Sequence, residues 1–432
     1  MNENKKQAIV DKLTYIITHT SDLASFSIAL PPKYGMGTGS SPIRLIGDAA
    51  KQYEAVCEMM QNEVVWRDKF SKRYTEEIVN QVLSNLHRDS NTDKASEYLD
   101  DVIANLDNYT LEHNVYLPVD GIAMLVDELK LGKLLLKNMS GETLIHFEQK
   151  VVAGIMQRSP QRGNEQLLAA WRRDALSIIR NKAVAIYTTV AESTRIQERA
   201  EEEWYQVVHI LRYFIFLAYQ KNWHIGFGLR GDVRYGVGQA IVIPSTYETF
   251  SKHETLKSPQ PFVITQEIVT AMKQLGVFAL TDMLDPQYAT AFSNTLLTGI
   301  RWVANALIQD EPANEFLSLV SCLETFLTRE KTDIGSIKNA IAGGVSWVLG
   351  SSLEERLNLQ REMKFIYDKR SMISHGGKQI EIAKLLPRLR FIVGAFILTM
   401  VLRREEFKNE GKKALHDWID EGPLRPAVTN QQ

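Results

Sequence analysis

The stretch SLEERLNLQREMKFIYDKRSMISHGG, residues 352–377, decides how the C-terminal part of the chain folds. Its residues up to His375 favour a helix, and the two consecutive glycines that follow are typical of a helix end. A histidine in the last turn complements the negative end of the helix dipole, and this role alone would explain His375. The same stretch also carries a guanidinium, at Arg370, five positions before the imidazole.

The spacing of Arg370 and His375 leaves two alternatives open. On a regular helix with ~3.6 residues per turn, residues five apart are rotated by roughly 140° and do not share a face. Either the two side chains have no joint role, or the helix frays toward Gly376 and the long arginine side chain bends toward the imidazole.

The segments on both sides of this stretch are helical in pattern from residue 285 to residue 407. Successive candidate helices cover residues 286–309, 312–330, 333–350, 352–375 and 381–407. Antiparallel helices with such short connections predict an all-α bundle. The apolar run from Phe391 to Leu402 is shorter than the roughly 20 residues that a membrane span needs, so we expect a buried core helix there. Trp302, Trp204 and three further tryptophans lie in apolar patterns and are also expected in cores.

The residues before the bundle predict a mixed α+β region. Residues 1–110 are mostly helical in pattern, and residues 111–284 mix short β-prone runs near residues 114–140 with continuous helical periodicity from Asn164 to Gln220. GFGLRG, residues 226–231, satisfies G-x-G-x-x-G but follows a helix, so a turn in a small β-sheet explains its glycines more simply than a dinucleotide site. Residues 408–432 are expected to form a C-terminal tail.

Composition restricts the class of protein. The 432 residues, 44% of them hydrophobic, are enough for two or three domains. A net charge of -2 argues against a surface coated for non-specific nucleic-acid binding, although it allows a local basic patch. Two distant cysteines, Cys57 and Cys322, fit a reducing cytoplasm, and the N-terminus lacks a signal-peptide core. The histidines form no HExxH or Cys/His cluster, so neither a metal nor a cofactor is expected.

From Asp310 onward the chain resembles an Apea-like HEPN domain, the bacterial branch of the HEPN ribonuclease superfamily. Three stretches in order carry the resemblance: residues 310–328, where Glu324 interrupts an apolar run; the helix pair of residues 337–350 and 354–370; and YDKRSMISHGG, residues 367–377. The last of these matches the family's Arg-x4-6-His motif. The resemblance covers about the last quarter of the chain.

The resemblance implies metal-independent RNA cleavage at a site where two such motifs face each other across a dimer. A base must take the proton of a ribose 2′-hydroxyl, and a cation must hold the phosphate as negative charge builds. Histidine exchanges protons near neutrality, and arginine grips phosphate oxygens through parallel hydrogen bonds. DNA lacks the nucleophile, so the mechanism selects RNA.

Residue by residue, the resemblance implies that His375 is the general base or acid and that Arg370 is the phosphate clamp. Ser371 would orient one of them. Glu324 matches an acidic residue on an earlier helix of similar domains, where it could fix the arginine; its alternative is a solvated helix position. Tyr367 is a supporting residue, more typical of a core than of catalysis.

Two lysines and two glycines complete the candidate site. Lys369 and Lys378 either contact RNA phosphates or are simply solvated. Gly376 and Gly377 stand where HEPN toxins controlled by nucleotidyltransferase antitoxins carry a modified tyrosine, which puts that form of control in doubt.

The resemblance implies a cytoplasmic endoribonuclease that acts as a homodimer or higher oligomer in prokaryotic anti-phage defence by abortive infection. The front portion would then restrain the nuclease until a partner protein or a phage-derived trigger releases it, and no membrane is involved. Two alternatives stay open. The bundle is a non-catalytic module for dimerisation or for RNA or partner binding, or the front portion binds a nucleotide or phage component and the bundle transmits that event.

Overall fold

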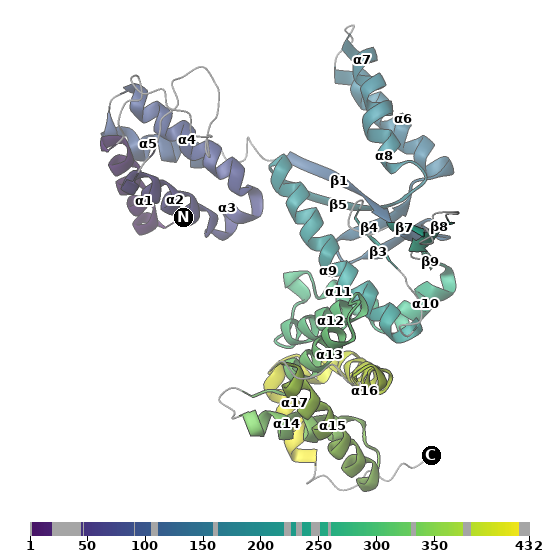
Figure 1. Ribbon diagram of the computed structural model, residues 1–432. Helices are drawn as coiled ribbons and strands as arrows, with labels where there is room; N and C mark the ends of the chain where they lie inside the picture. Colours follow the sequence, from purple (N-terminus) through teal and green to yellow (C-terminus); the bar gives the residue numbers. More distant parts are fainter. Residues whose placement is uncertain are drawn as a thin grey trace. The chain divides into compact units, whose positions relative to one another are not determined.

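The computed structural model describes residues 2–19, 45, 47–89, 91–104, 111–158, 163–219, 226–229, 236–242, 251–257, 261–329, 334–374 and 382–422 (Figure 1). Over these residues the fold is mainly α, as predicted. The chain divides into two compact units, residues 1–115 with 187–201 and residues 116–186 with 202–432. The second unit holds the bundle and most of the sheet, and β1 (residues 111–120) and β5 (residues 183–191) cross the division between the units. The finer boundaries expected after residues 110, 284 and 407 stay predictions.

The first unit is built from short helices around one apolar core, in agreement with the predicted helical N-terminal region. Its helices are α1 Glu3–Thr18, α2 Gly47–Gln61, α3 Val64–Lys69, α4 Lys72–Asp89, the 3-10 turn η1 Thr92–Lys94, and α5 Ala95–Ala104. The side chain of Asn2 caps α1 by accepting a hydrogen bond from the backbone N–H of Lys5. Ile9, Val56 and Leu86 are fully buried where these helices meet.

The sheet begins where the sequence predicts strands joined by turns. Its strands are β1 Leu111–Asp120, β2 Ile122–Met124, β3 Glu128–Leu131, β4 Leu134–Asn138, β5 Ala183–Ala191, β6 Gly228–Leu229, β7 Gly236–Val242, β8 Ser251–Lys257 and β9 Phe262–Ile264. The main sheet has the order β3-β4-β5-β1-β6. Gly121 turns the chain between β1 and β2 with a φ of 80°, a conformation that favours glycine.

Two further pairings complete the β structure. β2 pairs with β9 in parallel, and β7 pairs with β8 antiparallel. Gly228 pairs with Asp120 in the main sheet, which agrees with a β role for the glycine-rich GFGLRG stretch. Arg230 and Gly231, its last two residues, lie outside the described residues.

The sequence misses two elements in the middle of the chain. α6 Gly141–Arg158 is a helix that no expectation covered, and it is followed by α7 Gly163–Ala170, the π-helical segment Trp171–Leu176 and α8 Ser177–Ile179. The expectation of continuous helix from Asn164 is wrong at β5. Asn181 adopts a left-handed φ of 58°, which ends the helix, and β-branched residues then favour a strand.

The second unit contains a helical bundle that includes the helices predicted between residues 285 and 407 and also helices outside that range (Figure 1). It comprises α9 Ser193–Tyr219 (from residue 202 onward), α10 Gln266–Gln274, α11 Val277–Asp282, η5 Pro286–Tyr288, α12 Ser293–Leu307, α13 Pro312–Leu327, α14 Ile334–Leu349, α15 Leu353–Ser374, α16 Ile382–Leu402, η6 Arg404–Phe407 and α17 Lys412–Glu421. α13 runs through its core, where Phe316, Leu319 and Phe326 are fully buried. Pro312 begins this helix, a position where its missing N–H costs nothing.

α16 is the helix that the apolar run predicted. By length and composition it could cross a membrane, but 50% of its apolar window is buried inside the protein. Phe396 packs edge-on against Phe326 of α13, with ring centroids 5.5 Å apart. α16 is therefore a core helix of the bundle, as expected.

The expected C-terminal tail is in part a helix. α17 covers Lys412–Glu421 and buries Leu415 completely. His416 donates a hydrogen bond from Nε2 to the carbonyl oxygen of Phe326 at 2.9 Å, and Arg403 stacks on Trp418 at 4.1 Å. These contacts hold α17 in place, although the polar sequence of this segment does not by itself predict a helix. Residues 423–432 lie outside the described residues.

Two adjacent glycines in α14 predict opposite effects of the same substitution. A Cβ on Gly343 would meet nothing within 4 Å, whereas a Cβ on Gly344 would lie 2.5 Å from Cδ2 of the buried Leu327. We expect Gly343→Ala to raise the free energy of unfolding by about 0.5–1 kcal/mol through helix propensity. We expect Gly344→Ala to lower it by about 1 kcal/mol or more through overpacking. Urea denaturation of both variants checks this; equal shifts would contradict the packing of α13 on α14.

His209 of α9 predicts a pH dependence of stability. Burial, followed by the charges of Arg212 and Arg301, lowers the pKa of His209 to about 4, and its Nδ1 is buried without a hydrogen-bond partner. In the unfolded chain the imidazole of His209 has its ordinary pKa of ~6.5, so between that pH and pH 4 the unfolded chain binds more protons than the folded one. The stability that comes from keeping His209 neutral in the folded protein is therefore lost as pH falls from ~6.5 toward 4. The urea midpoint of the wild type should therefore drop more between about pH 7 and about pH 5 than that of His209→Gln. An equal drop in both proteins would contradict the burial of this imidazole.

Candidate functional site

One face of α13 and the C-terminal half of α15 form the candidate site. Asn314, Leu317, Ser321 and Glu324 follow one another on α13 at intervals of three and four residues, so they share a face of this helix. α15 packs beside α13 and ends its described part at Ser374. Residues that are 46 positions apart in the sequence meet between these two helices.

Glu324 and Arg370 make the central contact of the site. Arg370 forms an ion pair with Glu324, in which Nε lies 3.2 Å from Oε1 and Nη2 donates a hydrogen bond to Oε2 at 3.4 Å. The two side chains are 33% and 20% exposed, so the pair lies at the edge of the bundle rather than in its interior. A two-pronged contact of this kind fixes both the position and the plane of the guanidinium. Glu324 therefore contacts the arginine instead of extending into solvent.

Tyr367 supports this pair from one helical turn before Arg370. Its hydroxyl donates to Glu324 Oε1 at 3.1 Å, and the Arg370 guanidinium carbon lies 5.9 Å from the centre of its ring. Burial, followed by the charge of Glu324, raises the pKa of Tyr367, so the hydroxyl stays protonated and donates. The residue is only 6% exposed. Tyr367 is thus a core residue that holds the carboxylate.

Of the remaining predicted residues, the structure describes only Ser371 and Lys369. Ser371 and Lys369 are half-buried on α15, and Lys369 extends its Nζ over the ring of Phe365 at 5.1 Å. His375 and Lys378 lie outside the described residues, as do Gly376 and Gly377. The joint geometry of Arg370 and His375 therefore stays a prediction.

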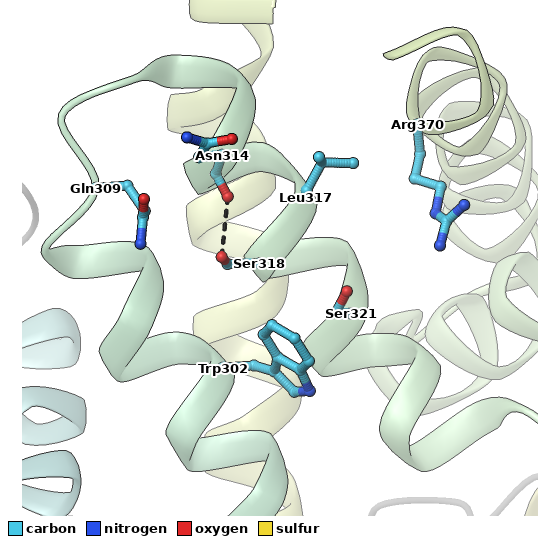
Figure 2. A pocket seen from close by; sticks show the side chains of 7 residues that line it. All are labelled: Trp302, Gln309, Asn314, Leu317, Ser318, Ser321 and Arg370. Atoms are coloured by element: carbon cyan, nitrogen blue, oxygen red, sulfur yellow. Dashed lines mark hydrogen bonds between the residues drawn. The ribbon is translucent and has the colours of Figure 1, made fainter. Parts of the chain in front are cut away.

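Arg370 also forms one wall of an open depression of about 370 Å³ (Figure 2). Figure 2 shows Arg370 of α15 on the side opposite Gln309 and Asn314, with Trp302 of α12 at the lower edge of the view. The main residues that line the depression are Trp302, Gln309, Asn314, Leu317, Ser321 and Arg370.

Trp302 corrects an expectation from the sequence. Trp204 is fully buried as expected, but Trp302 is 37% exposed and lines the depression. The apolar pattern of α12 places Trp302 beside its buried face, and only the position of α13 and α15 decides that the indole is left open. No signal within the sequence of α12 distinguishes these outcomes.

Within the described ranges, no group of three or more histidine, cysteine, aspartate or glutamate side chains is arranged to hold a metal ion. No family model, curated protein or solved structure matches the chain.

Proposed function

We propose that the chain is a metal-independent endoribonuclease of the HEPN type that cleaves RNA by attack of a ribose 2′-hydroxyl on the neighbouring phosphate. The observation that supports this most is the guanidinium of Arg370, held by Glu324 at the edge of an open depression. A cation fixed in this way meets the developing charge of the phosphate without having to reorganise. The Arg-x4-6-His motif provides the second group that the reaction needs.

In this proposal Glu324 and Tyr367 are positioning residues and Arg370 is the phosphate clamp. Glu324 orients the guanidinium, and the protonated hydroxyl of Tyr367 orients the carboxylate in turn. His375 takes the proton of the 2′-hydroxyl and returns one to the leaving 5′-oxygen, because its unperturbed pKa of ~6.5 allows both steps near neutral pH. Two copies of the chain would contribute their motifs to one composite site, in the cytoplasm.

The biological setting belongs to the same proposal. RNA cleavage that halts the growth of an infected cell would serve anti-phage defence, with residues 1–284 as the portion that restrains the nuclease. A partner protein or a phage-derived trigger would release this restraint. The assignment of this setting rests on the resemblance of the motif alone.

A second candidate function is a non-catalytic module for dimerisation or for RNA or partner binding. One observation favours it: the Glu324 carboxylate binds both Tyr367 and Arg370, and this cluster connects α13 to α15. A purely structural role would explain such a cluster without any reaction.

The His375→Ala variant separates the two functions. We expect it to keep the oligomeric state and the thermal stability of the wild type and to lose cleavage of single-stranded RNA, because only the proton-transfer group is removed. Light scattering, thermal unfolding and a gel-based cleavage assay measure these three properties. A variant that is less stable, beside a wild type that does not cut RNA, would favour the structural role.

A further inference from the structure

Trp302 is an aromatic side chain left accessible in a helix that buries most of its other apolar residues. In α12, Ile300, Val303 and Ala304 are completely buried, while Trp302 is 37% exposed. Its indole lines the depression together with Ser318 and Ser321 of α13 (Figure 2). An open indole in a concave site offers a flat surface for stacking.

Apart from the apolar Leu317, the side chains that line the depression with this indole are polar and of several types. Gln309 and Asn314 bring side-chain amides to the side of the depression opposite Arg370. Each amide is oriented by the protein, since Gln309 donates to the carbonyl of Asn305 and Asn314 donates to the carboxylate of Glu311, both at 3.3 Å. Amides of this kind recognise the hydrogen-bonding edge of a base, and a guanidinium recognises phosphate.

We propose that the depression is a nucleobase subsite for single-stranded RNA. The base stacks on the indole of Trp302, its edge faces Gln309 and Asn314, and the phosphate of the same nucleotide lies against Arg370. The inference rests on the proposed function for the identity of the polymer, but stacking and phosphate binding do not depend on cleavage. Sequence preference at the cleavage site would then be set by Trp302, Gln309 and Asn314, while Arg370 belongs to the reactive motif.

The dimensions and chemistry of the depression suit one nucleotide. A volume of about 370 Å³ lies at the small end of the range of small-molecule sites. An aromatic platform beside a cation is the arrangement that single-strand binding proteins use, and the platform contributes through the π-face that every base possesses. The amides add a preference among bases, because an unpaired polar edge in the subsite is unfavourable.

The test is binding of a short 2′-O-methyl oligonucleotide, which lacks the nucleophile, to the full-length chain, followed by fluorescence anisotropy. We expect Trp302→Ala to weaken binding by about 5- to 150-fold, the range that corresponds to loss of one base–aromatic stack. Trp302→Phe should retain most of the affinity because a ring remains. Tyr288→Ala removes another exposed aromatic side chain, 59% accessible, in the same unit and should bind like the wild type. Asn314→Ala should change the ratio of affinities among the four homo-oligonucleotides.

The possible outcomes distinguish the subsite from the nuclease. Weaker binding by Trp302→Ala supports the subsite, even if the wild type does not cleave ordinary RNA, a result that would remove only the proposed reaction. Unchanged binding by Trp302→Ala overturns the subsite, even if the wild type cleaves RNA. Failure of the wild type to bind the oligonucleotide overturns it as well.

Discussion

Arg370→Ala is expected to slow RNA cleavage by about 10²- to 10³-fold, the usual effect of removing one preorganised donor from a developing negative charge. The side chain is held by Glu324 through Nε and Nη2, so the wild-type guanidinium meets the phosphate in a fixed orientation. Arg370→Lys keeps the charge but loses the fork geometry, and we expect its rate to lie between those of the wild type and Arg370→Ala. Single-turnover cleavage of a labelled RNA measures all three rates.

Arg361→Ala is the matched control for this experiment. Arg361 is an exposed arginine on the same helix, where it donates to Asn358 and the carbonyl of Leu357. Removal of Arg361 changes the net charge of the chain by the same amount as Arg370→Ala. The rate of RNA cleavage by Arg361→Ala should stay within about twofold of the wild type, because exposed charges are largely screened. Equal losses in the two variants would reduce the role of Arg370 to general electrostatic attraction and would contradict a phosphate clamp.

Glu315→Ala is expected to lower the free energy of unfolding by about 3–5 kcal/mol, because it removes the carboxylate that pairs with the guanidinium of Arg390. The Glu315 side chain is 1% exposed in the first turn of α13. Arg390 of α16 donates from Nε to Oε1 at 2.5 Å and from Nη2 to Oε2 at 2.9 Å. This pair joins the two helices that form the centre of the bundle.

The comparison variant is Glu362→Ala. Glu362 of α15 accepts two-pronged hydrogen bonds from Arg388 of α16, so the chemistry of the contact is the same. The two side chains are 31% and 48% exposed, however, and the cost of removing a pair this accessible is about 0–1 kcal/mol. Urea midpoints of the two variants should therefore differ clearly. Similar small shifts in both would contradict the burial of Glu315.

Much of the bundle could be predicted because its helices carry their own signals. Three- and four-residue apolar spacing, Pro312 at the start of α13 and Gly350 after α14 mark these helices without reference to the rest of the fold. β5 and α17 could not be predicted in the same way. β5 is distinguished from a helix by the left-handed Asn181, and α17 by its packing on α13.

The candidate site depends on tertiary contacts that local patterns do not contain. The position of Glu324 relative to Arg370 was expected only from the resemblance, since nothing in the spacing of two residues 46 positions apart requires a contact. Trp302 is a residue for which the local pattern predicts the wrong burial. Its apolar helix predicts burial, but whether a neighbouring helix covers the indole is decided by α13 and α15.

The central claim is that the ribose 2′-hydroxyl is the nucleophile at the Arg370–His375 site. The most direct measurement is cleavage, in the presence of a chelator, of a DNA strand that contains a single ribonucleotide. We predict one cut, immediately 3′ to that ribose, that leaves a 2′,3′-cyclic phosphate and is lost in His375→Ala. Cuts at deoxyribose positions, or a cut that persists in His375→Ala, would contradict the claim.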